Sequence, residues 1–284
     1  MTTELWGWWL SPAALGVLGA CIGSFLNVVI HRLPVMLERQ WKRDCAEMLD
    51  QPLPEDGPPF NLIRPRSRCP QCGHMIRWYE NIPVLGWVLL KGRCSNCKTR
   101  ISARYPFVEL LTGALFALTA WKLGPQPVAL LWCAAIATLV ALTFIDWDTT
   151  LLPDDMTLPL LWAGLIAAAL GWNIPLTSAL WGAVGGYLSL WAVYWLFKLT
   201  TGKEGMGFGD FKLLAALGAW LGPTMLLPIL IGASVLGTVV GVAMKAGGAL
   251  REGRYVPFGP FLAGAGIAVF LIGPETVAGW LGWY

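Results

Sequence analysis

The sequence predicts an all-α polytopic membrane protein with about eight transmembrane helices and a small cytoplasmic zinc-ribbon module. Three observations predict this class. Hydrophobic residues make up 56% of the 284 residues and charged residues only 13%, about half the roughly 25% charged content of a soluble globular chain. The apolar residues form long runs, and two C-x-x-C pairs stand in the one polar stretch between them. A disordered chain would be richer in charge, and the net charge of +3 argues against a nucleic-acid binder.

The first segment, 1–30, is predicted to be a transmembrane helix with a periplasmic N-terminus. Its apolar run covers about 10–30. A cleaved signal peptide carries a basic leader, whereas the leader here contains Glu4 and no Lys or Arg. The basic residues begin only at Arg32. We therefore expect the helix to be retained, with its N-terminus outside.

The second segment, 31–106, is predicted to be a cytoplasmic zinc-binding module. It holds 13 of the 20 Lys and Arg residues of the chain. Its two C-x-x-C pairs are formed by Cys69, Cys72, Cys94 and Cys97. Four thiolates at this spacing can close a tetrahedral Zn²⁺ site, and the metal would be structural because no coordination position is left for water. The alternatives are a redox pair, which a reducing cytoplasm disfavours, and a metal-free remnant.

The third segment, 107–284, is predicted to be a multi-span core. Its apolar runs predict helices at about 107–123, 128–145, 156–170, 177–197, 211–221, 225–244 and 258–281. The run at 211–221 is shorter than the roughly 17 residues that cross a bilayer, so its depth stays open. With the N-terminus outside, nearly all Lys and Arg residues fall in inner segments, as the positive-inside rule requires.

Five of the 17 acidic residues gather at the inner ends of two predicted spans. They are Asp146, Asp148, Asp154, Asp155 and Asp210. Ionisable groups at the hydrocarbon boundary are costly and therefore candidates for function, although interfacial loop charges are the alternative. Two carboxylates that share a proton provide a general acid and a general base, which is enough to activate water against a peptide bond. No Ser/His/Asp set is available instead, because the two histidines are His31 and His74, and His74 lies inside the zinc module.

Motifs along nearly the whole chain occur in an order that is specific to one family. They are residues 23–34 (GSFLNVVIHRLP), both C-x-x-C pairs, 104–109 (RYPFVE), 144–146 (FID) with 152–154 (LPD), and 205–212 (GMGFGDFK). Within the last, Gly207-Phe208-Gly209-Asp210 matches a G-x-G-D element. On these residues the chain resembles the bacterial type IV prepilin peptidases, which are G-x-G-D intramembrane aspartyl proteases and N-methyltransferases. We see no departure from the pattern of that family.

The resemblance implies that Asp146 and Asp210 are the catalytic pair. It implies a protein of the bacterial inner membrane whose substrates are the prepilins and pseudopilins of type IV pilus and type II secretion systems. Their basic leader is cut at the cytoplasmic face, and the new N-terminus is then methylated from S-adenosylmethionine. The resemblance places methylation on the zinc module, where Gly92 would allow close approach and Arg93 would hold a carboxylate. A turn and a solvated charge explain these two residues equally well.

The other residues of the two acidic clusters are expected to bind the substrate. Nearby carboxylates attract a basic leader, so we expect Asp148, Asp154 and Asp155 to guide it. Gly207 and Gly209 would leave room for the substrate backbone to approach Asp210. The sequence assigns no role to Glu109 and Lys212, two further charges at the membrane edge.

Two other classes of protein remain open. A proton-coupled transporter also uses membrane carboxylates, but it holds them near the bilayer midplane, often with inverted repeats, whereas here they lie at span ends. A non-enzymatic scaffold would use the zinc module to dock partners. Release of a leader from a prepilin by the purified protein separates the three classes.

Overall fold

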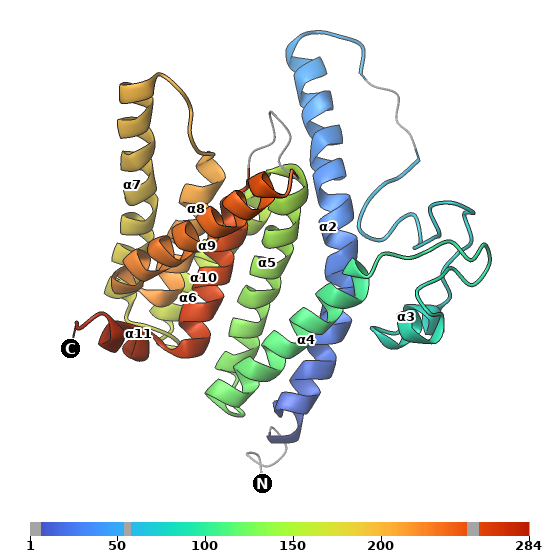
Figure 1. Ribbon diagram of the computed structural model, residues 1–284, viewed down its shortest axis with the longest axis horizontal. Helices are drawn as coiled ribbons and strands as arrows, with labels where there is room; N and C mark the ends of the chain where they lie inside the picture. The colour runs from blue at the N-terminus through green and yellow to red at the C-terminus, as the bar shows by residue number, and fades with distance from the viewer. Residues whose placement is uncertain (1–6, 54–57, 249–255, 284) are drawn as a thin grey trace. The chain divides into compact units, whose positions relative to one another are not determined.

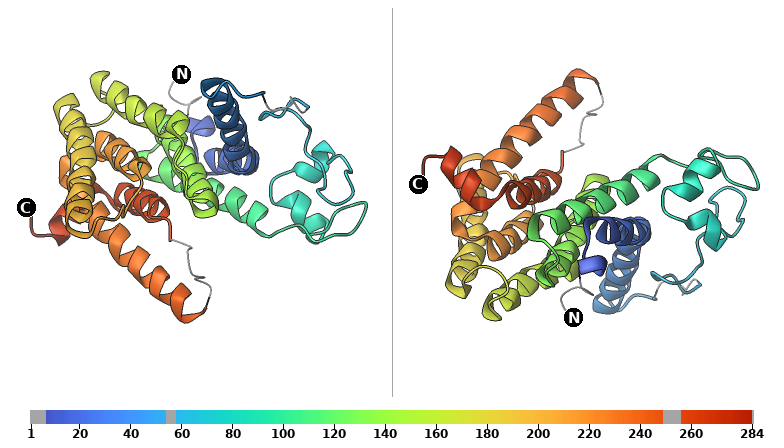
Figure 2. Two further views of the ribbon diagram at one scale, coloured as in Figure 1. Left: turned by 90° about the horizontal axis from the view of Figure 1, so that it is seen from above. Right: turned by 90° about the horizontal axis from the view of Figure 1, so that it is seen from below.

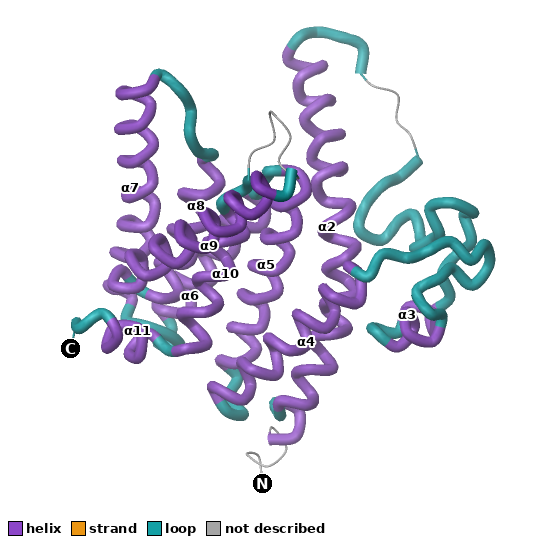
Figure 3. Tube along the Cα trace, in the orientation of Figure 1, coloured by secondary structure: helices purple, strands orange, loops and turns teal. Residues whose placement is uncertain are grey.

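The computed structural model describes residues 7–53, 58–248 and 256–283. These residues belong to two compact units, 1–137 and 138–284. Helices dominate both units, and the described ranges contain no strand (Figure 3). Two isolated β-bridges join Arg68 to Met75 and Arg93 to Arg100. The all-α prediction is confirmed, while Glu4 of the predicted leader lies outside the described residues.

The first unit is built on two long helices. Its elements are α2 (Pro12–Met48), the 3₁₀ helix η1 (Trp78–Asn81), α3 (Leu85–Leu89), α4 (Arg104–Leu123) and the first part of α5 (Val128–Thr149). Ser11 caps α2 by accepting a hydrogen bond from the backbone N–H of Ala14 at 3.3 Å. The helices α2 and α4 cross closely (Figure 1). A Cβ atom at Gly23 would lie 2.7 Å from the Cα atom of Glu109, so a small residue is required at this crossing.

The first helix is longer than its apolar run. It continues without a break from residue 30 to Met48, with Pro34 inside it. The predicted boundary at 30/31 therefore falls within a helix, and the break between the compact units lies at 137/138. The division of the chain into segments 1–30, 31–106 and 107–284 stays a prediction.

The second unit is a helical bundle with α8 at its centre. Its elements are the remainder of α5, then α6 (Asp154–Ala169), α7 (Leu176–Thr201), α8 (Phe208–Leu221), η2 (Pro223–Met225), α9 (Leu226–Ala246), α10 (Gly259–Ile272) and α11 (Pro274–Trp280). The helices α6, α7 and α10 all pack against α8. From Asp210 to Leu221 every residue except Lys212 is buried, which explains why α8 is apolar all round. The helix α9 packs against α10, and only three of its residues are buried. Figure 2 shows its C-terminal end extending beyond the bundle.

Each predicted apolar run contains a helix, but not every helix can span a bilayer alone. Within the described ranges, five helices are long and apolar enough, or six if one bent pair is a single span. The helices α6 and α8 have only 16 and 14 residues. The span predicted over 258–281 is not one continuous helix, because α10 and α11 meet at an angle of 97°. Whether the two helices form one broken span stays a prediction. Gly273 ends α10 with a φ of 107° and Pro274 starts α11, a combination that stops a helix. The exact number of spans stays a prediction.

Candidate active site

Asp146 lies at the C-terminal end of α5, and its side chain is buried with 5% of its surface exposed. The helix ends just beyond it, where Thr150 adopts a positive φ of 53°. The Asp146 carboxylate accepts a hydrogen bond from the backbone N–H of Gly259, the first residue of α10. A buried carboxylate is therefore placed where one helix ends and another begins.

Asp210 lies in the first turn of α8 and is 8% exposed. Gly207 is the N-cap of this helix, and its backbone N–H donates to the Asp210 carboxylate. This contact is the acidic half of a capping box, and it accounts for an acid three residues after the cap. The Oδ1 atom of Asp210 is buried without a hydrogen-bond partner among the described residues. Asp210 is also close enough to Asp146 for their charges to interact, so the two carboxylates share one buried site in the second unit.

Aromatic side chains cover the first turn of α8. The ring centroids of Phe208 and Phe211 are 5.2 Å apart, and that of Tyr194 on α7 is 5.3 Å from Phe208. Lys198, one turn after Tyr194, donates to Glu204 at 2.8 Å, and this hydrogen bond lowers the pKa of Glu204. The contacts tie α7 to the first turn of α8 and to the loop before Asp210. Sequence reasoning missed this cluster, for which the i,i+4 spacing of Tyr194 and Lys198 was a weak signal.

The three other acidic residues, Asp148, Asp154 and Asp155, are exposed. Asp154 forms an ion pair with Lys212, whose Nζ atom lies 2.6 Å from one carboxylate oxygen and 2.7 Å from the other. This contact gives Lys212 a partner, and it ties the start of α6 to α8 two residues after Asp210.

The two glycines of the G-x-G-D element differ in their surroundings. A Cβ atom at Gly209 would lie 2.7 Å from the Cβ atom of Leu152, which requires a glycine for packing. A Cβ atom at Gly207 would have only one neighbour, an Asp210 oxygen at 4.0 Å. Of the two, Gly207 therefore has open space beside it, whereas the position beside Gly209 is filled by Leu152.

Both C-x-x-C pairs fold into the same knuckle. In each, the backbone N–H of the first cysteine donates to the carbonyl of the residue five positions later, His74 for Cys69 and Thr99 for Cys94. The four sulfur atoms lie within 4.8 Å of one another. Two of their separations are 3.7 and 3.9 Å, close to the about 3.8 Å that a tetrahedral site with Zn–S distances of about 2.3 Å requires. Hydrogen bonds from Thr99 lower the pKa of Cys97 to about 6, which favours the thiolate that binds metal. The described residues fit a structural zinc ion.

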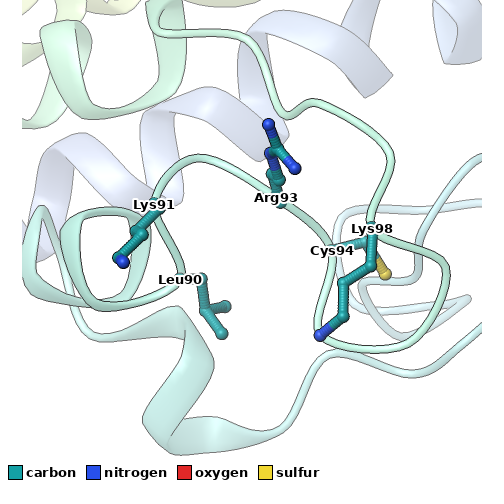
Figure 4. Close-up of a pocket in the computed structure, with 5 residues that line it drawn as sticks. All are labelled: Leu90, Lys91, Arg93, Cys94 and Lys98. Atoms are coloured by element: carbon teal, nitrogen blue, oxygen red, sulfur yellow. The ribbon is translucent and has the colours of Figure 1, made fainter.

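Gly92 and Arg93 lie between α3 and the second knuckle. Gly92 has a φ of +65°, and a Cβ atom there would lie 2.7 Å from the indole ring of Trp87. The turn and the nearby indole ring therefore explain why a glycine stands at this position. Arg93 lines a hollow of about 410 Å³ together with Leu90, Lys91, Cys94 and Lys98 (Figure 4). Three cationic side chains in one hollow can bind the carboxylate of a ligand. No acidic side chain is among the lining residues to bind a positively charged group of that ligand.

Glu109 is a buried carboxylate that sequence reasoning left without a role. It is 8% exposed and accepts a hydrogen bond from the backbone N–H of Val84 at 2.7 Å, and a second from the Ser24 side chain. Val84 has a positive φ of 61°, which is a strained conformation for a β-branched residue. Glu109 thus ties the turn before α3 to the crossing of α2 and α4. The sequence contains Gly23 and Glu109 in two separate motifs, 23–34 and 104–109, and gave no sign that they lie opposite each other.

Comparison with known proteins covers nearly the whole chain. The Bacterial Peptidase A24 N-terminal domain matches residues 17–123, and the Type IV leader peptidase family matches residues 133–242. A protein of Pseudomonas putida is 53% identical over 92% of this chain and 91% of its own length. One of Stutzerimonas stutzeri is 51% identical over 93% of this chain and 92% of its own. Both are named prepilin leader peptidase/N-methyltransferase.

A further relative from Aeromonas salmonicida (strain A449), with the same name, is 50% identical over 96% of this chain and 94% of its own length. No solved structure is significantly similar to the chain. The two family matches follow one another along the chain, and the second includes both buried aspartates. The chain belongs to the type IV leader peptidase family.

Proposed function

We propose that Asp146 and Asp210 are the catalytic dyad of a leader peptidase that cleaves type IV prepilins and pseudopilins. The observation that carries the proposal is the burial of these two carboxylates in one site, with the Asp210 Oδ1 atom left without a partner among the described residues. Two nearby buried carboxylates share a proton more easily than they carry two charges. The ionised member takes a proton from water, and the protonated member donates to the leaving amine.

The active site is proposed to face the cytoplasm of a bacterial inner membrane. The ends of α5 and α8 that carry Asp146 and Asp210 lie in segments that the positive-inside rule assigns to the inner side. Three exposed acidic residues, Asp148, Asp154 and Asp155, are found in the same segments. A basic prepilin leader would meet negative charge there.

The second activity is proposed to be N-methylation of the new N-terminus from S-adenosylmethionine. When bound, this cofactor supplies an electrophilic methyl group. Lys91, Arg93 and Lys98 of the basic hollow would hold its carboxylate. The hollow offers no acidic partner for the ammonium group of the cofactor among its lining residues, so we derive no step of methyl transfer there. The zinc ion would hold the two knuckles of the module together without taking part in chemistry.

The dyad is tested with Asp146→Asn and Asp210→Asn, each purified and incubated with a prepilin. We expect neither variant to release the leader. Both should still methylate an already cleaved pilin from labelled S-adenosylmethionine, because the substitutions leave the first unit unchanged. Asp44→Asn, which alters an exposed aspartate on α2, is the matched control. Wild-type cleavage by either dyad variant would overturn the assignment.

A further inference from the structure

The start of α10 presents a single outward backbone donor to Asp146. In the first turn of this helix the N–H groups of Phe261 and Leu262 both donate to the carbonyl of Phe258, at 3.1 and 3.2 Å. Pro260 has no N–H. The N–H of Gly259 is the remaining donor of the first four residues, and it hydrogen-bonds the Asp146 carboxylate. The positive end of the helix dipole of α10 is aimed at the same carboxylate.

Space, rather than backbone conformation, requires glycine at position 259. Gly259 is not among the residues with positive φ, so any residue could adopt its backbone angles. A Cβ atom there, however, would lie 2.5 Å from Asp146 Oδ2 and 3.1 and 3.2 Å from the two methyl carbons of Leu152. An alanine would therefore push directly on the carboxylate oxygen.

Leu152 links this contact to the second aspartate. It is 9% exposed, and it lies against Gly259 on one side and Gly209 on the other, where an added Cβ atom would come within 2.7 Å of it. Gly209 directly precedes Asp210 in the chain. One leucine side chain is thus held between two glycines, each of which adjoins one of the buried aspartates.

A ring contact fixes α10 in this place. Trp147, the residue after Asp146, packs edge to face against Phe261 with ring centroids 6.4 Å apart. The first turn of α10 is therefore attached to the end of α5 by this ring contact as well as by the hydrogen bond from Gly259.

We propose that Gly259 is a positioning residue for Asp146 and that Leu152, held between Gly209 and Gly259, sets the spacing of the two aspartates. This inference rests on the proposed dyad. Gly259 orients the Asp146 carboxylate through its N–H, and the absence of a side chain lets that N–H reach the oxygen. Leu152 prevents α8 and α10 from closing on each other.

The test is steady-state cleavage of a prepilin by Gly259→Ala, Leu152→Ala, the double variant and Gly264→Ala. Gly264 lies on the same helix, and a Cβ atom there has no neighbour within 4 Å. We expect Gly259→Ala to lower kcat on the order of 100-fold, the cost of misplacing a catalytic group by about 1 Å. KM should stay unchanged, because Gly259 is buried against Asp146 and Leu152. Methylation of an already cleaved pilin should also stay unchanged.

The double variant distinguishes positioning from packing. Shortening Leu152 leaves room for α10 to move away from Asp146, so Gly259→Ala with Leu152→Ala should cleave faster than Gly259→Ala alone. Wild-type kcat in Gly259→Ala would overturn the inference. The inference would also be overturned if Gly259→Ala lost both cleavage and methylation and the double variant recovered neither. That pattern would show that position 259 is needed only for folding. Cleavage by Asp146→Asn would instead overturn the dyad itself.

Discussion

The ion pair between Lys212 and Asp154 decides whether Asp154 holds the protein together or captures the substrate. The two side chains come from α8 and α6 and are in bidentate contact at 2.6 and 2.7 Å. The perturbation is a set of three variants: Asp154→Asn, Lys212→Gln, and the exchange Asp154→Lys with Lys212→Asp. Each single variant removes the pair from one side, and the exchange rebuilds it with the charges reversed.

The structure limits the size of the effect. The side chain of Asp154 is 53% exposed and that of Lys212 is 27% exposed. Exposed ion pairs contribute about 0.2–1 kcal/mol after screening by solvent. If all of this free energy positions α8, its loss lowers kcat/KM by at most about 5-fold, since about 1.4 kcal/mol corresponds to a factor of 10.

Kinetics of prepilin cleavage at low and high salt provide the assay. We expect both single variants to lower kcat/KM by similar factors. The exchange should restore most of the loss, because residues in direct contact show non-additive effects. The effects should shrink at high salt. If Asp154 instead captures the basic leader, Lys212→Gln would free the Asp154 carboxylate for the leader and lower KM. The exchange would raise KM, because it puts a lysine at position 154. That pattern would refute the structural role of the pair.

Three other outcomes are expected. Native mass spectrometry should detect one zinc ion in the wild type and none in Cys72→Ser, whose module should also become accessible to protease. Cys45→Ser, an exposed position on α2, should keep the zinc ion and its protease resistance. Trp220→Phe removes the 2.8 Å hydrogen bond from Nε1 to the Leu160 carbonyl and leaves a small void, so thermal unfolding in detergent should show a loss of about 1–3 kcal/mol. Glu109→Ala should lower the free energy of unfolding by about 1–3 kcal/mol, because the N–H of Val84 loses its acceptor. Glu109→Gln keeps an acceptor and should be nearly neutral, so equal melting temperatures of the two variants would contradict the contact.

Local patterns in the sequence were sufficient for several features. The scarcity of charge and the apolar runs predicted the helices, because each run reports on its own surroundings. The two C-x-x-C pairs predicted the cluster of Cys69, Cys72, Cys94 and Cys97, since ligands within a knuckle are close in the chain. The clusters of acidic residues at span ends singled out five carboxylates. The resemblance of the FID and G-x-G-D motifs, rather than a local pattern, chose Asp146 and Asp210 among them.

Burial separates the same two residues from the other three. Asp146 and Asp210 are enclosed, while Asp148, Asp154 and Asp155 are exposed, and no periodic pattern distinguishes the two groups. The bend at Gly273 was likewise hidden in an apolar run, because hydropathy does not register a change of direction.

The amino-acid sequence by itself determined where the apolar helices lie, which residues can bind metal and which carboxylates are candidates for chemistry. Only the tertiary structure decided what those carboxylates touch. The hydrogen bond from Gly259 to Asp146, the pair between Asp154 and Lys212, and the place of Leu152 between two glycines all join residues far apart in the chain. Such contacts depend on how closely helices pack, and packing is a property of the assembled bundle that spacing along one helix does not encode.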